Sequence, residues 1–185
     1  MKDKNIFIFL IVSINIILYT VDYRSGVLFL GGASDSFSQE WYRYITSLFI
    51  HSNINHIISN MLNFVIFGIA LSKYVNLLKF ILIYFFGGII SNIISVYLYM
   101  IIYKNDIFQS IGASGAIYSI IGAFTCCVIL NYKKYNFSNI LIYIFFIIYN
   151  IYNNNFENIN LVAHISGFII GIILMIILYK EKEYV

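Results

Sequence analysis

Charged residues are scarce in this sequence, and their scarcity excludes an ordinary soluble protein. Only 10% of the 185 residues are charged and 61% are hydrophobic, whereas soluble domains carry about 25% charged residues. The composition therefore indicates a membrane protein. The formal net charge of +3 comes with no signature of nucleic-acid binding, so we expect no nucleic-acid partner.

Proline is absent and cysteine is nearly so. We attribute the lack of proline, together with many Asn, Ile, Tyr and Lys residues, to an AT-rich genome rather than to a structural demand. The two cysteines, Cys126 and Cys127, are adjacent, so they have neither the geometry of a pair nor the spacing of metal ligands. We expect both to be buried, reduced and structural.

Long uncharged runs fill most of the chain. A membrane-spanning helix needs about 20 mainly apolar residues, and six of these runs can each hold one, the first being the shortest. We therefore predict an all-α polytopic membrane protein, a bundle of six transmembrane helices in one domain over residues 1–185. The predicted helices cover residues 5–22, 54–72, 80–102, 113–131, 138–152 and 161–179.

The distribution of Lys and Arg predicts the orientation of this bundle. Lys2 and Lys4 precede the first apolar run, as in a signal peptide, but no small-residue cleavage pattern follows, so we predict a retained first helix. Cytoplasmic loops are rich in Lys and Arg. The side of the bundle that holds both chain ends carries all of these residues except Arg24, Arg43 and Lys104, so we predict that both termini face the cytoplasm.

Several polar residues are predicted to share one layer of the bundle. The helices predicted at 54–72, 113–131 and 161–179 all run from the outside inward, with polar residues in their first two turns. At a rise of about 1.5 Å per residue, these side chains lie on the order of 3–10 Å below the helix starts. Polar side chains in the hydrocarbon region are costly and usually mark a functional interior. The residues concerned are His56, Asn60, Ser114 and His164.

Small residues predict close contact between two of these helices. Gly167 and Gly171 are four residues apart, and Gly115 and Ser119 repeat that spacing in the helix predicted at 113–131. Such small-residue faces let two helix backbones approach each other closely. We therefore expect the last predicted helix to pack against the helix that carries Ser114.

This layer contains the groups that acyl transfer requires. Ser114 and Tyr118 share a helix face, so close packing brings Ser114 toward His164 and lets Tyr118 stack on the imidazole. A serine hydroxyl becomes a nucleophile when a histidine takes its proton. The side-chain N–H groups of His56 and Asn60, and the free backbone N–H of Ser114, are suited to hold the oxyanion. No acidic residue lies in the membrane near His164, so we predict a Ser–His dyad.

Three histidines raise the alternative of a metal site. Membrane zinc proteases use a His-Glu-x-x-His motif, which is absent here, and no carboxylate is available beside the histidines within the membrane. We therefore predict neither a metal nor a cofactor.

Two segments resemble motifs of the rhomboid family of intramembrane serine proteases. GASG, which contains Gly112 and Ser114 and is followed by Tyr118, resembles the nucleophile motif of that family. AHISGFIIG, which contains His164, resembles the family's histidine helix with the pattern AHxxGxxxG. Each motif is weak alone, because short patterns of small residues occur by chance.

Two further segments extend the resemblance to most of the chain. HSNINHIISN resembles the family pattern H-x4-H-x3-N and adds His51 to His56 and Asn60. EWYRYITSLF resembles the Trp-Arg segment of the first loop, although Tyr42 stands at the tryptophan position and Trp41 is one place early. The four motifs occur in the family's order on the expected helices, which makes them strong together.

The resemblance implies a six-helix serine endopeptidase that cleaves transmembrane protein substrates in or near their membrane-spanning segments. It implies a dyad of Ser114 and His164, an oxyanion hole of His56, Asn60 and the Ser114 amide, and no metal or cofactor. Tyr118, Gly112 and His51 would support the site. The expected location is a bacterial plasma membrane, among lipids, with the active site toward the extracytoplasmic face. The helix at 138–152 and the loop after it would gate access. The oligomeric state stays open.

Two other classes of protein compete with this hypothesis. An inactive relative would bind client helices without cutting them, but such proteins typically lose the serine or the histidine, and this chain keeps both. A six-helix transporter or channel would show internal symmetry or broken helices, and the sequence has neither.

Overall fold

Long apolar helices make up most of the part of the chain that the structure describes. The computed structural model describes residues 2–25, 32–33, 40–103, 109–131, 143 and 160–178. Within α1, α3, α4 and α7 there is a stretch long and apolar enough to cross a membrane, and α5 is a shorter apolar helix. The prediction of an all-α polytopic membrane protein is therefore confirmed. The elements are α1 (Lys2–Ser25), α2 (Arg43–Thr46), the 3₁₀ turn η2 (Ser47–Phe49), α3 (Ile54–Ser72), α4 (Leu77–Tyr103), α5 (Ser114–Leu130) and α7 (Leu161–Leu178).

The helix predicted at 80–102 begins earlier than its uncharged run. Lys79 interrupts the apolar pattern, yet α4 starts at Leu77 and contains this residue in its first turn. The side chain of Asn76 accepts a hydrogen bond from the backbone N–H of Lys79 (2.9 Å), and such capping stabilises a helix start. α1 likewise extends beyond both ends of its prediction. The boundaries of α3, α5 and α7 lie within one residue of those predicted, and the helix predicted at 138–152 lies outside the described residues, Tyr143 excepted.

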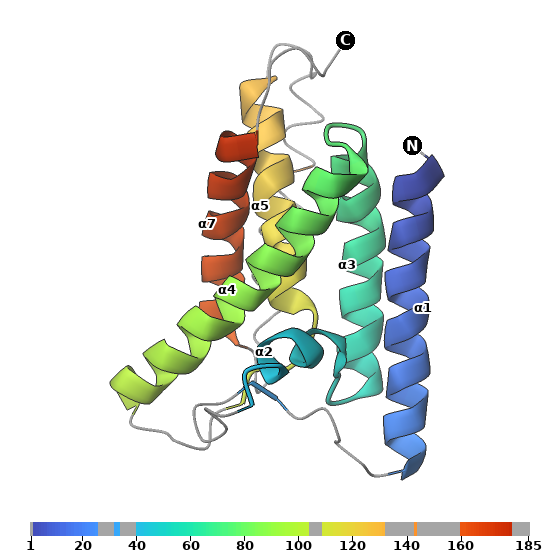
Figure 1. Ribbon diagram of the computed structural model, residues 1–185, viewed down its shortest axis with the longest axis vertical. Helices are drawn as coiled ribbons and strands as arrows, with labels where there is room; N and C mark the ends of the chain where they lie inside the picture. The colour runs from blue at the N-terminus through green and yellow to red at the C-terminus, as the bar shows by residue number, and fades with distance from the viewer. Residues whose placement is uncertain are drawn as a thin grey trace.

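Three helices begin at the same end of the molecule. In Figure 1, α3, α5 and α7 all start at the lower end, where α2 lies, while α4 descends obliquely across α5 and α7. α1 runs beside α3 in the opposite direction. The common direction of α3, α5 and α7 is the one that the sequence predicts, and it gathers their first turns at one end of the bundle.

Aromatic rings fill the space between α1, α3 and α4. Phe64 and Tyr84 have ring centroids 5.0 Å apart, and Phe7 of α1 meets Phe80 edge-on at 5.8 Å. Tyr84, Phe64 and Phe80 are fully buried. Large side chains therefore keep these three helices at a distance that suits aromatic packing.

α5 and α7 instead meet backbone to backbone. A Cβ added at Gly167 would overlap the carbonyl oxygen of Gly115, and one added at Gly171 would overlap the carbonyl oxygen of Ser119. Only glycine allows this approach, which confirms the contact predicted from the small-residue spacing. The nearby cysteines of α5 are free and buried, as predicted.

Candidate active site

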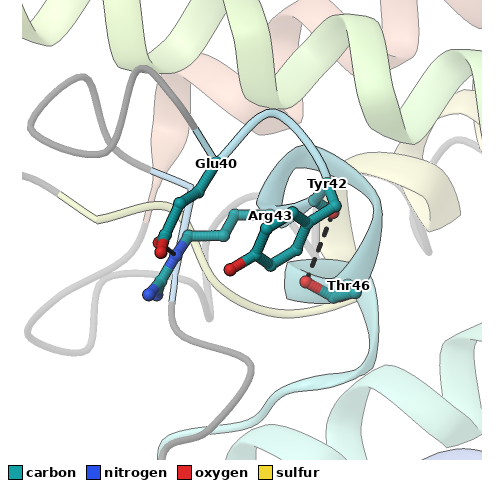
Figure 2. A network of polar contacts seen from close by, with 4 residues as sticks. All are labelled: Glu40, Tyr42, Arg43 and Thr46. Carbon is teal, nitrogen blue, oxygen red and sulfur yellow. Dashed lines mark hydrogen bonds and ion pairs between the residues drawn. The ribbon is translucent and has the colours of Figure 1, made fainter.

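The short helix α2 lies at the end of the bundle where α3, α5 and α7 begin (Figure 1). Here, the guanidinium of Arg43 pairs with the carboxylate of Glu40, and the hydroxyl of Thr46 donates to the carbonyl of Tyr42 at 3.3 Å (Figure 2). Trp41 is 69% exposed. An exposed tryptophan beside a turn that is closed by its own polar contacts suits the interface level of a membrane.

Ser114 and His164 occupy the first turns of two helices in contact. Ser114 is the first residue of α5, and His164 is the fourth residue of α7. Both are buried among protein atoms, with exposed fractions of 8% and 7%. The fold therefore brings these two segments, 50 positions apart in the chain, to the same end of the α5–α7 contact.

Tyr118 connects the two helices at this level. Its ring stacks on the imidazole of His164, with centroids 4.2 Å apart and planes inclined by 14°. Tyr118 lies one turn after Ser114 on the same face of α5, so the stacking turns the face that carries Ser114 toward His164. This is the contact that the spacing of the two residues predicts.

Gly112, two residues before Ser114, packs against the first turns of α3. A Cβ added at Gly112 would lie 2.7 Å from Cε1 and Nε2 of His56 and 3.4 Å from Nδ2 of Asn60. Gly112 also has a φ of +102°, a conformation that side chains other than glycine rarely adopt. His56 and Asn60 are thus packed around the turn that leads into Ser114.

The side-chain amide of Asn60, beside Gly112, has an unpaired hydrogen-bond donor. Its Nδ2 is buried and has no hydrogen-bond partner among the described residues. An unpaired buried amide is costly, so this donor calls for an explanation. The imidazole of His56, in contrast, is held by Ser52, whose Oγ lies 3.2 Å from Nδ1, and the backbone N–H of His56 donates to the side chain of Asn53 (2.9 Å).

His51 lies behind His56 rather than at the surface. The two rings meet edge to face, with centroids 5.0 Å apart and planes inclined by 68°, and His51 is only 3% exposed. Burial, reinforced by the neighbouring His56, lowers the pKa of His51 to about 3. The lowered pKa favours the neutral imidazole, which contacts the ring of His56.

A buried hydrogen-bond network that the motifs did not indicate lies beside the candidate site. Asn92 and Ser95 of α4, with Ser91 beside them, are polar residues in the middle of a long apolar helix, and this was the signal available in the sequence. Through their side chains, Asn92 and Ser95 join the first loop, the segment before Ser114 and the residue before α7. We call this set the asparagine–serine network; its members are Ser47, Asn92, Ser95, Ser110 and Asn160.

Together these features define a class of protein: a polytopic helical membrane protein that gathers a serine, histidines and an asparagine at one end of three helices. The family model described as Rhomboid domain matches residues 38–181, which is most of the chain. The chain belongs to the rhomboid family.

Curated relatives from bacteria and plants carry the same family name. The chain is 28% identical over 148 residues to the protein of Bacillus subtilis (strain 168) named "Putative rhomboid protease YdcA", covering 78% of this chain and 70% of that protein. It is 30% identical over 146 residues to the mitochondrial RHOMBOID-like protein 6 of Arabidopsis thaliana, covering 78% and 46% of the two chains. It is 29% identical over 181 residues to the rhomboid protease AarA of Providencia stuartii, covering 84% and 63%. The chain thus spans less than two thirds of the latter two relatives.

Proposed function

We propose that this rhomboid-family chain is an intramembrane serine endopeptidase in which Ser114 is the nucleophile and His164 the general base. The observation that carries the proposal is the stacking of Tyr118 on His164 at 4.2 Å, one turn from Ser114. This stacking holds the imidazole of His164 near the start of α5, where the hydroxyl of Ser114 lies. Two relatives support the same activity: the Bacillus subtilis protein named "Putative rhomboid protease YdcA" and the Providencia stuartii protein named rhomboid protease AarA.

The reaction follows from the chemistry of these two groups. His164 takes the proton of the Ser114 hydroxyl while the oxygen attacks the carbonyl carbon of the scissile peptide bond. The bond to nitrogen then breaks, and His164 returns the proton to the leaving amine. A water molecule, deprotonated by the same imidazole, hydrolyses the acyl-enzyme and restores the free hydroxyl.

In this reaction the unpaired amide of Asn60 would donate a hydrogen bond to the oxyanion. The tetrahedral intermediate places a negative charge on the former carbonyl oxygen, and donors that already point at this position stabilise it. Asn60 Nδ2 and the backbone N–H of Ser114 would supply two of them. If Nδ1 of His56 accepts a hydrogen bond from Ser52 (3.2 Å), the proton lies on Nε2, the atom beside Gly112, and His56 supplies a third.

The substrates in this proposal are transmembrane proteins cleaved in or near their spans. The site lies in the first turns of α3, α5 and α7, so a peptide bond would reach it at one membrane surface. The excess of Lys on the side of both termini supports the extracytoplasmic surface of a bacterial plasma membrane. The gate expected at 138–152 and the following loop lies outside the described residues.

The test is proteolysis of a labelled single-span membrane protein by the purified chain, together with labelling by a fluorophosphonate. We expect the wild type to cleave and to be labelled at Ser114. Ser114→Ala and His164→Ala should each lower kcat by more than about a thousandfold, as in other enzymes whose serine and histidine act as a unit.

Ser119→Ala is the matched control for this experiment. Ser119 is a buried serine of the same helix whose hydroxyl donates to the carbonyl of Ile83 (3.0 Å), away from the first turn. It should cleave like the wild type. Equal behaviour of the wild type, Ser114→Ala and His164→Ala would instead assign the chain to the non-catalytic relatives that bind client helices.

A further inference from the structure

Asn160 fixes the turn of α7 that carries His164. It directly precedes the helix, and its Oδ1 accepts a hydrogen bond from the backbone N–H of Ala163 (3.0 Å). Its own carbonyl accepts from the backbone N–H of His164 (3.2 Å). This is the geometry of an N-cap, so the position of the Asn160 side chain decides where the first turn of α7 begins.

Ser110 fixes the segment that leads into Ser114. It precedes the serine by four residues, and its backbone exchanges two hydrogen bonds with Ala33 (2.9 and 3.0 Å). Its hydroxyl is buried, accepts from Nδ2 of Asn160 (2.7 Å) and donates to Oδ1 of Asn92 (2.8 Å). A single hydroxyl therefore connects the two segments on which Ser114 and His164 depend.

Asn92 ties this connection to the rest of the bundle. Its Nδ2 donates to the hydroxyl of Ser47 (3.0 Å) and to the carbonyl of Tyr44 (3.2 Å). The carbonyl of Ser47 accepts from the N–H of Gly112 (2.9 Å), the residue packed against His56. Through Ser47, the network is therefore also connected to Gly112, in the segment that precedes Ser114.

The direction of these hydrogen bonds is set by backbone groups at both ends. The N–H of Ala163 can only donate, so Oδ1 of Asn160 faces it and Nδ2 faces Ser110. The carbonyl of Tyr44 can only accept, so Nδ2 of Asn92 faces it and Oδ1 faces Ser110. The hydroxyl of Ser110 then accepts from one amide and donates to the other, and the network has one arrangement that satisfies every member.

We propose that Ser110, Asn92 and Asn160 are positioning residues that set the distance between the Ser114 segment and the first turn of α7. The proposal rests on the proposed function, because it concerns the Ser114–His164 pair. Catalysis by two groups on separate helices depends on their separation, and a misplacement of roughly 1 Å can cost on the order of a hundredfold in rate. A network whose members are all hydrogen-bonded, with Asn160 partly buried and the others buried, resists such a shift.

The experiment follows inactivation of Ser114 by a fluorophosphonate in Ser110→Ala. We expect the maximal inactivation rate to fall roughly ten- to a hundredfold, with the half-saturating concentration of the probe unchanged. Ser110→Thr keeps a hydroxyl that accepts and donates, so it should recover most of the rate. Ser119→Ala, which also removes a buried interhelical hydroxyl, should retain the wild-type rate. A wild-type rate in Ser110→Ala would overturn the proposal.

A double-mutant cycle in thermal unfolding tests the network without any activity. Asn160→Asp keeps an oxygen for the N–H of Ala163 but loses the donor to Ser110. If the two residues act through one contact, Ser110→Ala and Asn160→Asp should lower the melting temperature by less together than the sum of their separate effects. Additive changes in melting temperature would show that the two residues act independently and would overturn the proposal. Absence of wild-type labelling would overturn the proposed function, and the cycle would still decide whether the two segments are coupled.

Discussion

At the scale of single residues, the ring of Tyr118 restrains the imidazole of His164 by stacking on it. The planes of the two rings are inclined by only 14°, so the tyrosine covers one face of the imidazole. An aromatic contact of this kind contributes about 0.5–1.5 kcal/mol. The restraint is modest in energy, but it acts on the group that serves as the general base in the proposed function.

Two substitutions of Tyr118 distinguish the effect of its aromatic ring from the effect of its hydroxyl. Tyr118→Phe keeps the stacked ring and should retain most of the wild-type kcat. Tyr118→Ala removes the stacking restraint on the imidazole and should lower kcat roughly tenfold, which corresponds to about 1.4 kcal/mol, with little change in KM. Steady-state cleavage of a labelled single-span substrate provides both constants. A Tyr118→Ala enzyme as fast as the wild type would show that stacking has no part in catalysis.

The lowered pKa of His51 predicts that stability depends on pH in an acidic window. Its pKa is lowered to about 3 by burial and by the neighbouring His56, whereas an unfolded histidine titrates near about 6.5. Between these values the unfolded chain binds more protons than the folded one, so stability falls as the pH falls.

His51→Gln should flatten this dependence. The stability contributed by the neutral imidazole is complete above about pH 6.5 and declines toward pH 3, at most by about 1.4 kcal/mol per pH unit for one group. Melting temperatures measured at intervals from pH 7 to pH 4 should therefore drop more steeply for the wild type than for the variant. Because His56 and His164 remain in both proteins, parallel curves would mean that His51 contributes nothing.

At the scale of helices, glycine sets the distance between α5 and α7. The carbonyl oxygens of Gly115 and Ser119 occupy the space where side chains of Gly167 and Gly171 would lie. Lipid is as apolar as a helix surface, so close packing and not water exclusion holds such helices together. The same contact brings the first turns of both helices within reach of each other.

Gly171→Ala should push the two helices apart. Overpacking of this kind typically lowers the free energy of unfolding by about 1–3 kcal/mol, and labelling of Ser114 should slow because its helix moves away from His164. Ile173→Ala on the same helix is the matched control, since Ile173 is 48% exposed and faces away from the contact. Thermal unfolding in detergent measures the first effect, and equal losses at both positions would argue against a special role of the glycine.

At the scale of the whole molecule, the first turns of α3, α5 and α7 form one polar layer at one end of an apolar bundle. Side chains such as Phe9, Ile176 and Ile177 are more than half exposed, as expected for surfaces that contact lipid tails. The layer carries Ser114, His164 and Asn60 on the inside of the bundle. These polar groups are thereby kept out of lipid, at the end of the bundle where the three helices begin.

The side of the membrane that this layer faces can be measured by cysteine labelling. Asn55 is exposed at the start of α3 and Lys73 at its end. In intact cells, a membrane-impermeant maleimide should label Asn55→Cys, whereas Lys73→Cys should react only after permeabilisation. Both variants should be made with Cys126 and Cys127 replaced by serine to remove background. The reverse pattern would place the candidate site on the cytoplasmic side and contradict the predicted orientation.

The sequence by itself determined the class of protein and predicted a common layer for the candidate site residues. Uncharged runs specify where helices can cross a membrane, and a rise of about 1.5 Å per residue then fixes the level of His56, Ser114 and His164. The glycine spacing of α7 specifies which face packs closely. These features are local, because each depends on residues within one helix.

Only the tertiary structure decided how the segments around those groups are held. Asn92, Ser110 and Asn160 come from three segments far apart in the chain, and each is an ordinary polar residue until the fold joins their amides and hydroxyl. The same holds for the unpaired donor of Asn60, which becomes visible only when its neighbours are in place. Hydrogen bonds between distant side chains depend on the directions of three helices at once, and no periodicity within one helix encodes them.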